Sequence, residues 1–137
     1  MSTEDLRDQA IVAAVSAAVP TAVAVYLFGS TASGASGPQS DVDVAILPLR
    51  PMDPVARFDA QERLASILRR SVDLIDLRTA SSVMAMQVLA TGRLLYDADP
   101  VSRGAFEDRA FGAYARLNEE RRGILARVTT EGSVYGR

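Results

Sequence analysis

The chain has 137 residues, of which 48% are hydrophobic, and it carries a formal net charge of −2 with an isoelectric point near 5.1. This length predicts a single domain over residues 1–137, and no apolar run is long enough to cross a membrane, so we expect a cytoplasmic protein with no membrane partner. Cysteine and histidine are absent and all 15 basic residues are arginine, which excludes thiolate, imidazole and Schiff-base chemistry and leaves carboxylates, hydroxyls, arginine and bound metals.

The first part of the chain predicts one helix and two strands. Apolar residues recur at helical spacing from Glu4 to Val19, and Pro20 ends that helix. Two apolar runs, Val23 to Phe28 and Val42 to Leu47, are bounded by glycine or proline and are rich in β-branched or aromatic residues, which predicts buried strands. The residues between the two runs have the Ser, Thr, Gly, Pro and Gln composition of a loop.

Asp41 and Asp43 stand at the start of the second predicted strand. Side chains alternate between the faces of a strand, so both carboxylates are expected to point the same way. Two such charges at the start of an apolar strand repel each other and are poorly solvated. A bound divalent cation is the simplest remedy, and hard oxygen ligands at this spacing suit Mg²⁺, which also binds substrate phosphates.

Gly29 and Ser30 follow the first predicted strand and supply the complementary half of a site. A serine in this position is a good helix N-cap, and the N–H groups beyond such a cap attract phosphate. If the two strands are antiparallel neighbours, this turn and the two carboxylates meet in one place. A P-loop is the alternative, because Gly29 and Gly34 fit its two glycines, but Ala35 and Ser36 replace the residues that follow and the phosphate-binding lysine is absent, so that alternative fails.

A turn with three prolines, Pro48 to Pro54, leads into an amphipathic helix predicted from Val55 to Arg69. Charged residues, Arg57 among them, are expected mostly on the outer side of this helix. The predicted apolar stripe consists of Val55, Phe58, Leu64, Ile67 and Leu68.

The next strand, Ser71 to Leu77, is expected to supply a third carboxylate. A strand, a helix and a strand of these lengths imply a crossover, which makes the second and third strands parallel if they are neighbours. Asp41 and Asp73 then lie at the same end of the sheet. Asp76 lies about 10 Å further along the strand and on the opposite face, so we select Asp73 and keep Asp76 as the alternative.

The remainder of the chain predicts a helix from Ser82 to Ala90, a short edge strand from Arg93 to Tyr96 and a long helix from Val101 to about Thr130. Asp97 and Asp99 repeat the spacing of Asp41 and Asp43, but they precede a proline at the end of a strand, so we interpret them as a turn that leads into the next helix. The interleaved arginines and acids of the long helix are typical of a solvated face.

These motifs resemble a known family. Gly29-Ser30, a loop over residues 31–40 and Asp41-Val42-Asp43, with an apolar strand on either side, resemble the signature of the DNA-polymerase-β-like nucleotidyltransferase superfamily, and specifically its minimal nucleotidyltransferase (MNT) branch. Val72-Asp73-Leu74 resembles the hydrophobic-Asp-hydrophobic strand common in that branch, and Ile75-Asp76-Leu77 fits the same pattern. The resemblance implies an α/β (α+β) polymerase-β-like fold with a small mixed sheet, flanking helices and a long C-terminal helix.

The same resemblance implies a Mg²⁺-dependent nucleotidyltransferase that moves AMP from ATP to an acceptor hydroxyl. The implied catalytic residues and ligands of two Mg²⁺ ions are Asp41, Asp43 and Asp73. The implied nucleotide-binding residues are Gly29, Ser30 and Ser40.

A long C-terminal helix with an Arg/Tyr tail is similar to the antitoxin members of the MNT family. This similarity implies a hetero-oligomer with a HEPN-domain toxin, commonly a ribonuclease, which is encoded by the adjacent gene, modified on a tyrosine and contacted by residues 101–137. Two alternatives stay open: an antitoxin that neutralises its partner by binding alone, and an aminoglycoside-type nucleotidyltransferase, whose usual additional helical domain does not fit this length. The acidic composition does not favour a nucleic-acid substrate.

Overall fold

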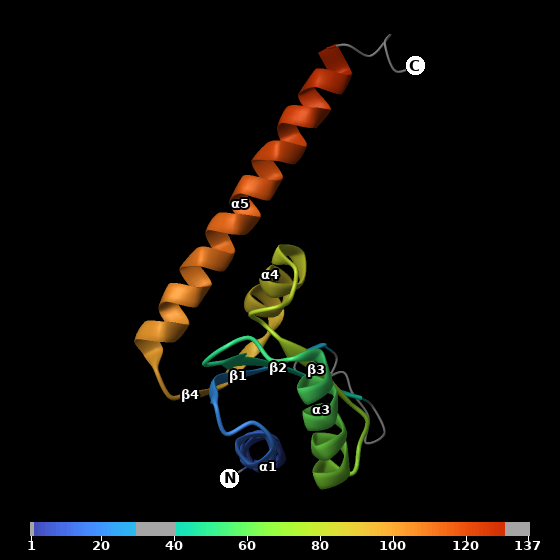
Figure 1. The fold of residues 1–137 in the computed structure, drawn as a ribbon, viewed down its shortest axis with the longest axis vertical. Helices are drawn as coiled ribbons and strands as arrows, with labels where there is room; N and C mark the ends of the chain where they lie inside the picture. The colour runs from blue at the N-terminus through green and yellow to red at the C-terminus, as the bar shows by residue number, and fades with distance from the viewer. Residues whose placement is uncertain (1, 30–40, 131–137) are drawn as a thin grey trace.

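The computed structural model describes residues 2–29 and 41–130, with side chains as far as Ile124. A four-stranded sheet lies between two pairs of helices, and the second half of the last helix extends away from the body (Figure 1). Each predicted element lies within one residue of its observed bounds, and the mixed α/β fold class is confirmed. In chain order the elements are α1 (Thr3–Ala18), β1 (Ala22–Phe28), β2 (Val42–Pro48), α3 (Pro54–Leu68), β3 (Val72–Asp76), α4 (Ser82–Thr91), β4 (Arg93–Asp97) and α5 (Pro100–Thr130).

The strands of the sheet follow the order β3-β2-β1-β4. β1 is antiparallel to both β2 and β4, whereas β2 and β3 are parallel. The parallel pair follows from α3, because a strand can return in the same direction only through a crossover connection. The predicted antiparallel β1–β2 pair, the parallel β2–β3 pair and the edge position of β4 are therefore confirmed.

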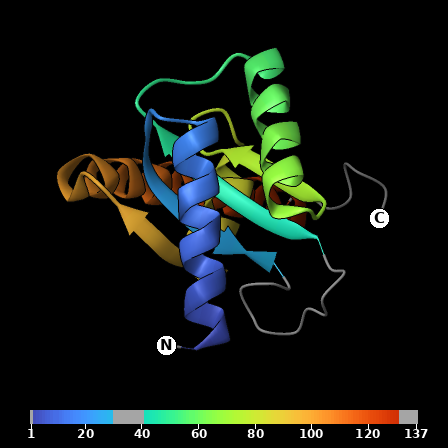
Figure 2. The same ribbon diagram turned by 90° about the horizontal axis from the view of Figure 1, so that it is seen from below.

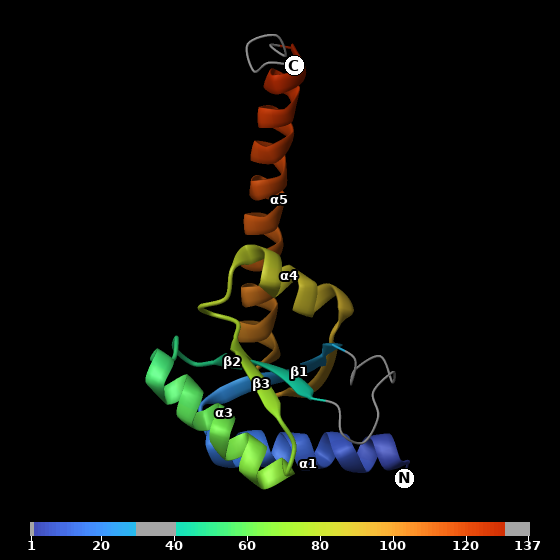
Figure 3. The same ribbon diagram turned by 90° about the vertical axis from the view of Figure 1, so that its right-hand side faces the viewer.

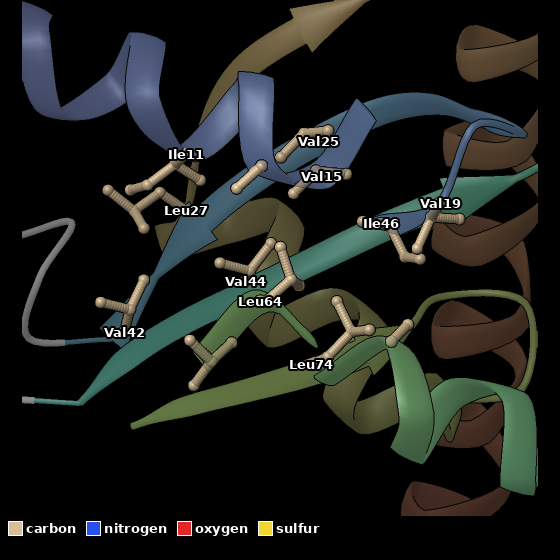
Figure 4. Packing of buried hydrophobic residues seen from close by; sticks show 13 residues of the cluster. Ile11, Val15, Val19, Val25, Leu27, Val42, Val44, Ile46, Leu64 and Leu74 are labelled. Atoms are coloured by element: carbon tan, nitrogen blue, oxygen red, sulfur yellow. The ribbon is translucent and has the colours of Figure 1, made fainter. Parts of the chain in front are cut away.

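The core has two layers because β1, β2 and β3 place alternate side chains on opposite faces of the sheet. α1 and α3 lie across one face, as Figure 2 shows from below. This layer contains Ile11, Val15, Leu64 and the inward side chains of β1, β2 and β3, including Val44 and Leu74 (Figure 4). The second layer, under α4 and the first turns of α5, consists of Val23, Ala24, Tyr26, Phe28, Ala45, Leu47, Leu77, Ala85, Val88, Phe106 and Ala110.

The predicted orientation of α3 is wrong. Val55, Phe58 and Ile67, which the apolar stripe places in the core, are 66%, 51% and 47% exposed, and only Leu64 of that stripe is fully buried. The inward face also carries Ala60, which is buried. The hydrophobic pattern fails here because two polar residues of α3 also face the sheet.

Those two residues are Arg57 and Gln61, one helical turn apart on α3. The Gln61 Oε1 accepts a hydrogen bond from the backbone N–H of Leu74 at 2.9 Å, and the Arg57 guanidinium donates to the Leu74 carbonyl at 3.0 Å. Leu74 lies on β3, whose outer backbone groups have no neighbouring strand in this sheet. The predicted outward position of Arg57 is therefore corrected, because the edge strand needs hydrogen-bond partners that α3 provides.

α5 begins at the turn that the sequence predicts. The Asp99 carboxylate accepts hydrogen bonds from the Ser102 backbone N–H at 3.1 Å and from its hydroxyl at 2.8 Å, which caps the helix. Arg103 then bridges Asp97 at 2.7 Å and Glu107 at 2.9 Å. These contacts fix the first turns of α5 to the edge of the sheet.

Beyond its contacts with α4, α5 extends away from the sheet (Figure 3). Phe111 and Ile124 on this helix are 46% and 51% exposed. None of the helices in the described ranges is both long and apolar enough to cross a membrane.

Candidate active site

The end of β1 and the start of β2 lie side by side at one end of the sheet. Phe28 and Asp43 are cross-strand partners, so Gly29 directly follows the residue opposite Asp43. Gly29 has a φ of 75°, which an L side chain rarely adopts. A Cβ on Gly29 would overlap the Asp43 Oδ2 and lie 3.0 Å from its Cγ. The glycine is thus required both by its backbone conformation and by the closeness of the Asp43 carboxylate.

β3 brings Asp73 to the same place. Asp43 and Asp73 are partners in the parallel β2–β3 register. Val42, Val44, Val72 and Leu74 are buried in the layer under α1 and α3, so both carboxylates lie on the opposite face of the sheet. Asp41 directly precedes β2, and its side chain and that of Asp73 are exposed, whereas Asp43 is half-buried.

The charges of this group act on one another. Burial raises the pKa of Asp43 above its ordinary value of 3.8, and the negative charges of Asp73 and Asp41 raise it further. Both causes disfavour the ionised form of Asp43. Such a perturbed carboxylate beside a second carboxylate is typical of a functional site, because the fold gains nothing from the repulsion itself.

Asp76, the alternative third carboxylate, lies elsewhere. It is the one buried charged residue of the part of the chain that the structure describes, at 2% exposure. Its carboxylate accepts hydrogen bonds from the backbone N–H groups of Met52 at 2.7 Å and Arg78 at 2.9 Å. These bonds join the β2–α3 connection to the turn that follows β3. Asp76 is thus held by backbone donors, and its partner in the β2–β3 register is Ile46 and not Asp43.

The donor set of Asp41, Asp43 and Asp73 fits a hard divalent cation. All three residues offer carboxylate oxygens, which Mg²⁺ prefers, and a cation between them would relieve the repulsion that Asp43 experiences. Within residues 2–29 and 41–130, no three acidic side chains are gathered closely enough to form a metal site by themselves.

Two of the predicted nucleotide-binding residues, Ser30 and Ser40, lie outside the described residues, while Gly29 lies beside Asp43. The sequence prediction did not find the cavity of about 280 Å³ next to Asp73, whose lining includes Arg57 and Met84. Helical and strand periodicity could not find it, because α3, β3 and α4 meet there only through the tertiary fold.

Replacing Gly29 with alanine is expected to lower the free energy of unfolding by about 1–3 kcal/mol, the usual cost of a non-glycine residue in this conformation. The new methyl group would also displace the Asp43 carboxylate. Gly104→Ala is the matched control, because a Cβ there meets no atom within 4 Å. It should stabilise α5 by about 0.5–1 kcal/mol. Urea unfolding measures both changes, and equal effects would contradict the role of Gly29.

Comparison with known proteins defines the class of this site. Residues 12–101 match the polymerase beta nucleotidyltransferase family. The chain belongs to this family and is a nucleotidyltransferase, which confirms the resemblance of its Gly-Ser and Asp-x-Asp residues.

The similarity extends to particular relatives. The chain is 33% identical over 122 residues to the protein adenylyltransferase MntA of Shewanella oneidensis, covering 89% of this chain and 87% of the relative. A crystal structure of a toxin–antitoxin with AMP-PNP superposes with a TM-score of 0.77 at 33% identity, over 89% of this chain and 98% of that one. The structure of a tri-AMPylated HEPN toxin in complex with MNT antitoxin, also from S. oneidensis, superposes with a TM-score of 0.75 at 31% identity. The match covers 93% of this chain and 99% of that chain.

Proposed function

We propose that this protein is a Mg²⁺-dependent protein adenylyltransferase that moves AMP from ATP to a tyrosine hydroxyl of a cognate HEPN toxin and so acts as its antitoxin. The observation that carries the proposal is the pairing of Asp43 with Asp73 beside Gly29, in a chain of the nucleotidyltransferase family. The name of the S. oneidensis relative and the tri-AMPylated state of the toxin in the similar complex support the choice of AMP and of a protein acceptor.

The transfer is a single displacement at phosphorus. The acceptor oxygen attacks the α-phosphorus of ATP, the new P–O bond forms, and the bond between that phosphorus and the oxygen that bridges to the β-phosphate breaks. Pyrophosphate leaves, and the proton of the acceptor hydroxyl passes to the Asp73 carboxylate, which acts as general base.

Asp41 and Asp43, together with Asp73, would hold the Mg²⁺ ions. When bound, Mg²⁺ neutralises the charge of the phosphates and of the transition state. The backbone at Gly29 and Ser30 would position the terminal phosphates, and Ser40 would contact the nucleotide from the other end of the same loop. Gly29 lies close to the Asp43 carboxylate, so the residues that would hold phosphate and those that would hold the metal are neighbours.

α5 is the surface proposed for contact with the toxin, within residues 101–137. Its exposed Phe111 and Ile124 lie on a helix that extends away from the sheet (Figure 3). The structural similarity to toxin–antitoxin complexes covers most of this chain, which supports such a hetero-complex.

Intact-mass spectrometry of the toxin tests the proposal. The product of the neighbouring gene, incubated with this protein, Mg²⁺ and ATP, should gain mass in steps of one AMP. The Asp41→Ala/Asp43→Ala variant should lose this activity by about 10³-fold or more, because metal stabilisation of the transition state is worth several kcal/mol and each 1.4 kcal/mol is tenfold. If the wild-type chain forms a stable complex with the toxin but the toxin gains no mass, the protein is an antitoxin that acts by binding alone.

A further inference from the structure

A cavity of about 280 Å³ opens beside Asp73 along the outer edge of β3, between α3 and α4. Three elements form its walls. Asp73, Ile75 and Asp76 come from β3, and Arg57 comes from α3. Ala80 and Met84 come from the turn before α4 and from α4 itself, as does Ser81. Asp41, Asp43 and Gly29 are not among its lining residues, so the cavity extends from the carboxylate group on the side away from β1.

The size of the cavity decides what it can hold. Pockets that enclose whole cofactors or drug-sized ligands measure about 300–1,000 Å³. A cavity just below that range has room for one aromatic side chain. ATP is assigned to the side of Gly29 and Asp43, so the space on the far side of Asp73 is available to the other reactant.

Resting on the function proposed above, we propose that this cavity is the acceptor subsite, which takes the tyrosine side chain of the protein substrate and presents its hydroxyl to Asp73. The side chains of Ala80 and Met84 set the shape of the subsite, and they act as specificity-determining residues. Asp73 is the one carboxylate that belongs both to the paired group and to the cavity.

The lining suits an aromatic ring that ends in a hydroxyl. Ile75 and Met84 offer apolar surface, and a methionine sulfur makes favourable contacts with aromatic rings. The Ser81 hydroxyl accepts a hydrogen bond from the Met84 N–H at 3.1 Å, which leaves its own proton to donate to a ligand. An aliphatic serine or threonine acceptor would leave the apolar walls unfilled.

Arg57 has a second role in this region, because it donates to the Leu74 carbonyl and to Gln61 Oε1. A variant of Arg57 would therefore disturb the edge of the sheet as well as the cavity. Ala80 and Met84 are better probes. The φ of Ala80 is not positive, so a leucine fits its backbone, and Met84 is only half-buried.

The test uses steady-state transfer of AMP from ATP to the toxin by the full-length chain. Ala80→Leu narrows the cavity and should lower kcat/KM for the toxin by about 10–200-fold. This is the range expected when a pocket and its ligand differ in size by a methylene group or more. Met84→Ala removes an apolar wall and should lower the same ratio by about tenfold. For both variants the KM for ATP and the thermal stabilisation by Mg²⁺ with ATP should stay at wild-type values.

α4 offers matched controls on a different cavity. Ala90 and Met86 line a separate cavity with Tyr114. Ala90→Leu and Met86→Ala make the same chemical changes as the two test variants, and both should transfer AMP at the wild-type rate. All four variants should still form the complex with the toxin.

The outcomes separate this inference from the proposed function. If Ala80→Leu and Met84→Ala keep the kcat/KM of the wild type for the toxin, the subsite is overturned. It is also overturned if the two control variants lose as much kcat/KM as the two test variants. If the wild-type chain transfers no AMP at all, the proposed function fails and the subsite fails with it. If the wild type is active and only the cavity variants are slow toward the toxin, both stand.

Discussion

Replacing Asp43 with asparagine is expected to raise the melting temperature of the ligand-free chain by a few degrees and to abolish its stabilisation by Mg²⁺ with ATP. The two changes have opposite signs because the same carboxylate is unfavourable without a cation and necessary with one. Transfer of AMP should be lost in the same variant. The combination of a more stable fold and a lost activity distinguishes a functional residue from a structural one.

The effect on the ligand-free chain follows from the direction of the pKa shift. Burial, with the charges of Asp73 and Asp41, raises the pKa of Asp43 above 3.8 in the folded chain. The folded chain therefore binds the proton more tightly than the unfolded chain, and the free energy of unfolding falls as the pH rises from 3.8 through the raised pKa. At neutral pH the ionised carboxylate is a net cost to the fold. Asparagine removes that cost and this part of the pH dependence.

The effect of the ligand follows from mass action. A ligand that binds only the folded chain stabilises it by about 2.7 kcal/mol at a hundredfold excess over its Kd, which raises the melting temperature by several degrees. The Asp43→Asn variant lacks the negative charge that would hold the metal, so the rise in melting temperature with Mg²⁺ and ATP should disappear. Thermal unfolding from pH 4 to pH 8, with and without Mg²⁺ and ATP, measures both effects.

Asp59→Asn on α3 is the matched control, because its side chain is exposed and far along the chain from the paired carboxylates. It should leave both the melting temperature and the ligand shift close to the wild type. A wild-type chain that does not respond to Mg²⁺ with ATP would contradict the site. A lower apo melting temperature in Asp43→Asn would contradict the electrostatic argument.

Much of this site could be predicted from local sequence patterns and one topological rule. Apolar runs that end at Gly29 and Pro48 define β1 and β2, so the positions of Gly29 and Asp43 at the ends of these strands follow directly. The crossover through α3 then requires β3 to run parallel to β2. Parallel neighbours place Asp73 level with Asp43, which the observed register bears out.

The parts that the sequence did not predict depend on contacts between elements. Hydrophobicity placed Val55 and Phe58 inside and Arg57 outside, but the edge of β3 needs partners for the backbone of Leu74. Arg57 and Gln61 provide these hydrogen bonds. A periodicity that counts only apolar residues does not predict polar side chains that face the sheet. The cavity beside Asp73 was missed for the same reason, since Arg57 turns inward to line it.

The two aspartates of β3 should respond to the same substitution in opposite ways. Asp73→Asn is expected to lower the rate of AMP transfer by about 10²–10⁴-fold, the usual contribution of a general base. Its side chain is exposed, so the free energy of unfolding should change little. Binding of ATP should persist, because Asp41 and Asp43 remain to hold the metal.

Asp76→Asn should instead lower the free energy of unfolding by about 1.5–3 kcal/mol. The carboxylate accepts backbone N–H bonds on both oxygens, and an asparagine must point its NH₂ group at one of these donors. The folded fraction of this variant should transfer AMP at close to the wild-type rate, because the Asp76 carboxylate is bonded to backbone groups and pairs with Ile46 in the register, not with Asp43. Urea unfolding and single-turnover transfer, measured on both variants, provide the comparison.

If Asp76→Asn stopped the chemistry while Asp73→Asn did not, the assignment of the third carboxylate would be reversed. The register argues against that result. Both aspartates line the cavity, but Asp73 is the cross-strand partner of Asp43, whereas Asp76 is 2% exposed and bonded to the connection between β2 and α3. Each oxygen of the Asp76 carboxylate accepts a backbone N–H bond, so this side chain is fixed in place by the fold. The difference between the two residues is thus one of hydrogen bonding and not of sequence pattern, since Val72-Asp73-Leu74 and Ile75-Asp76-Leu77 are equivalent as patterns.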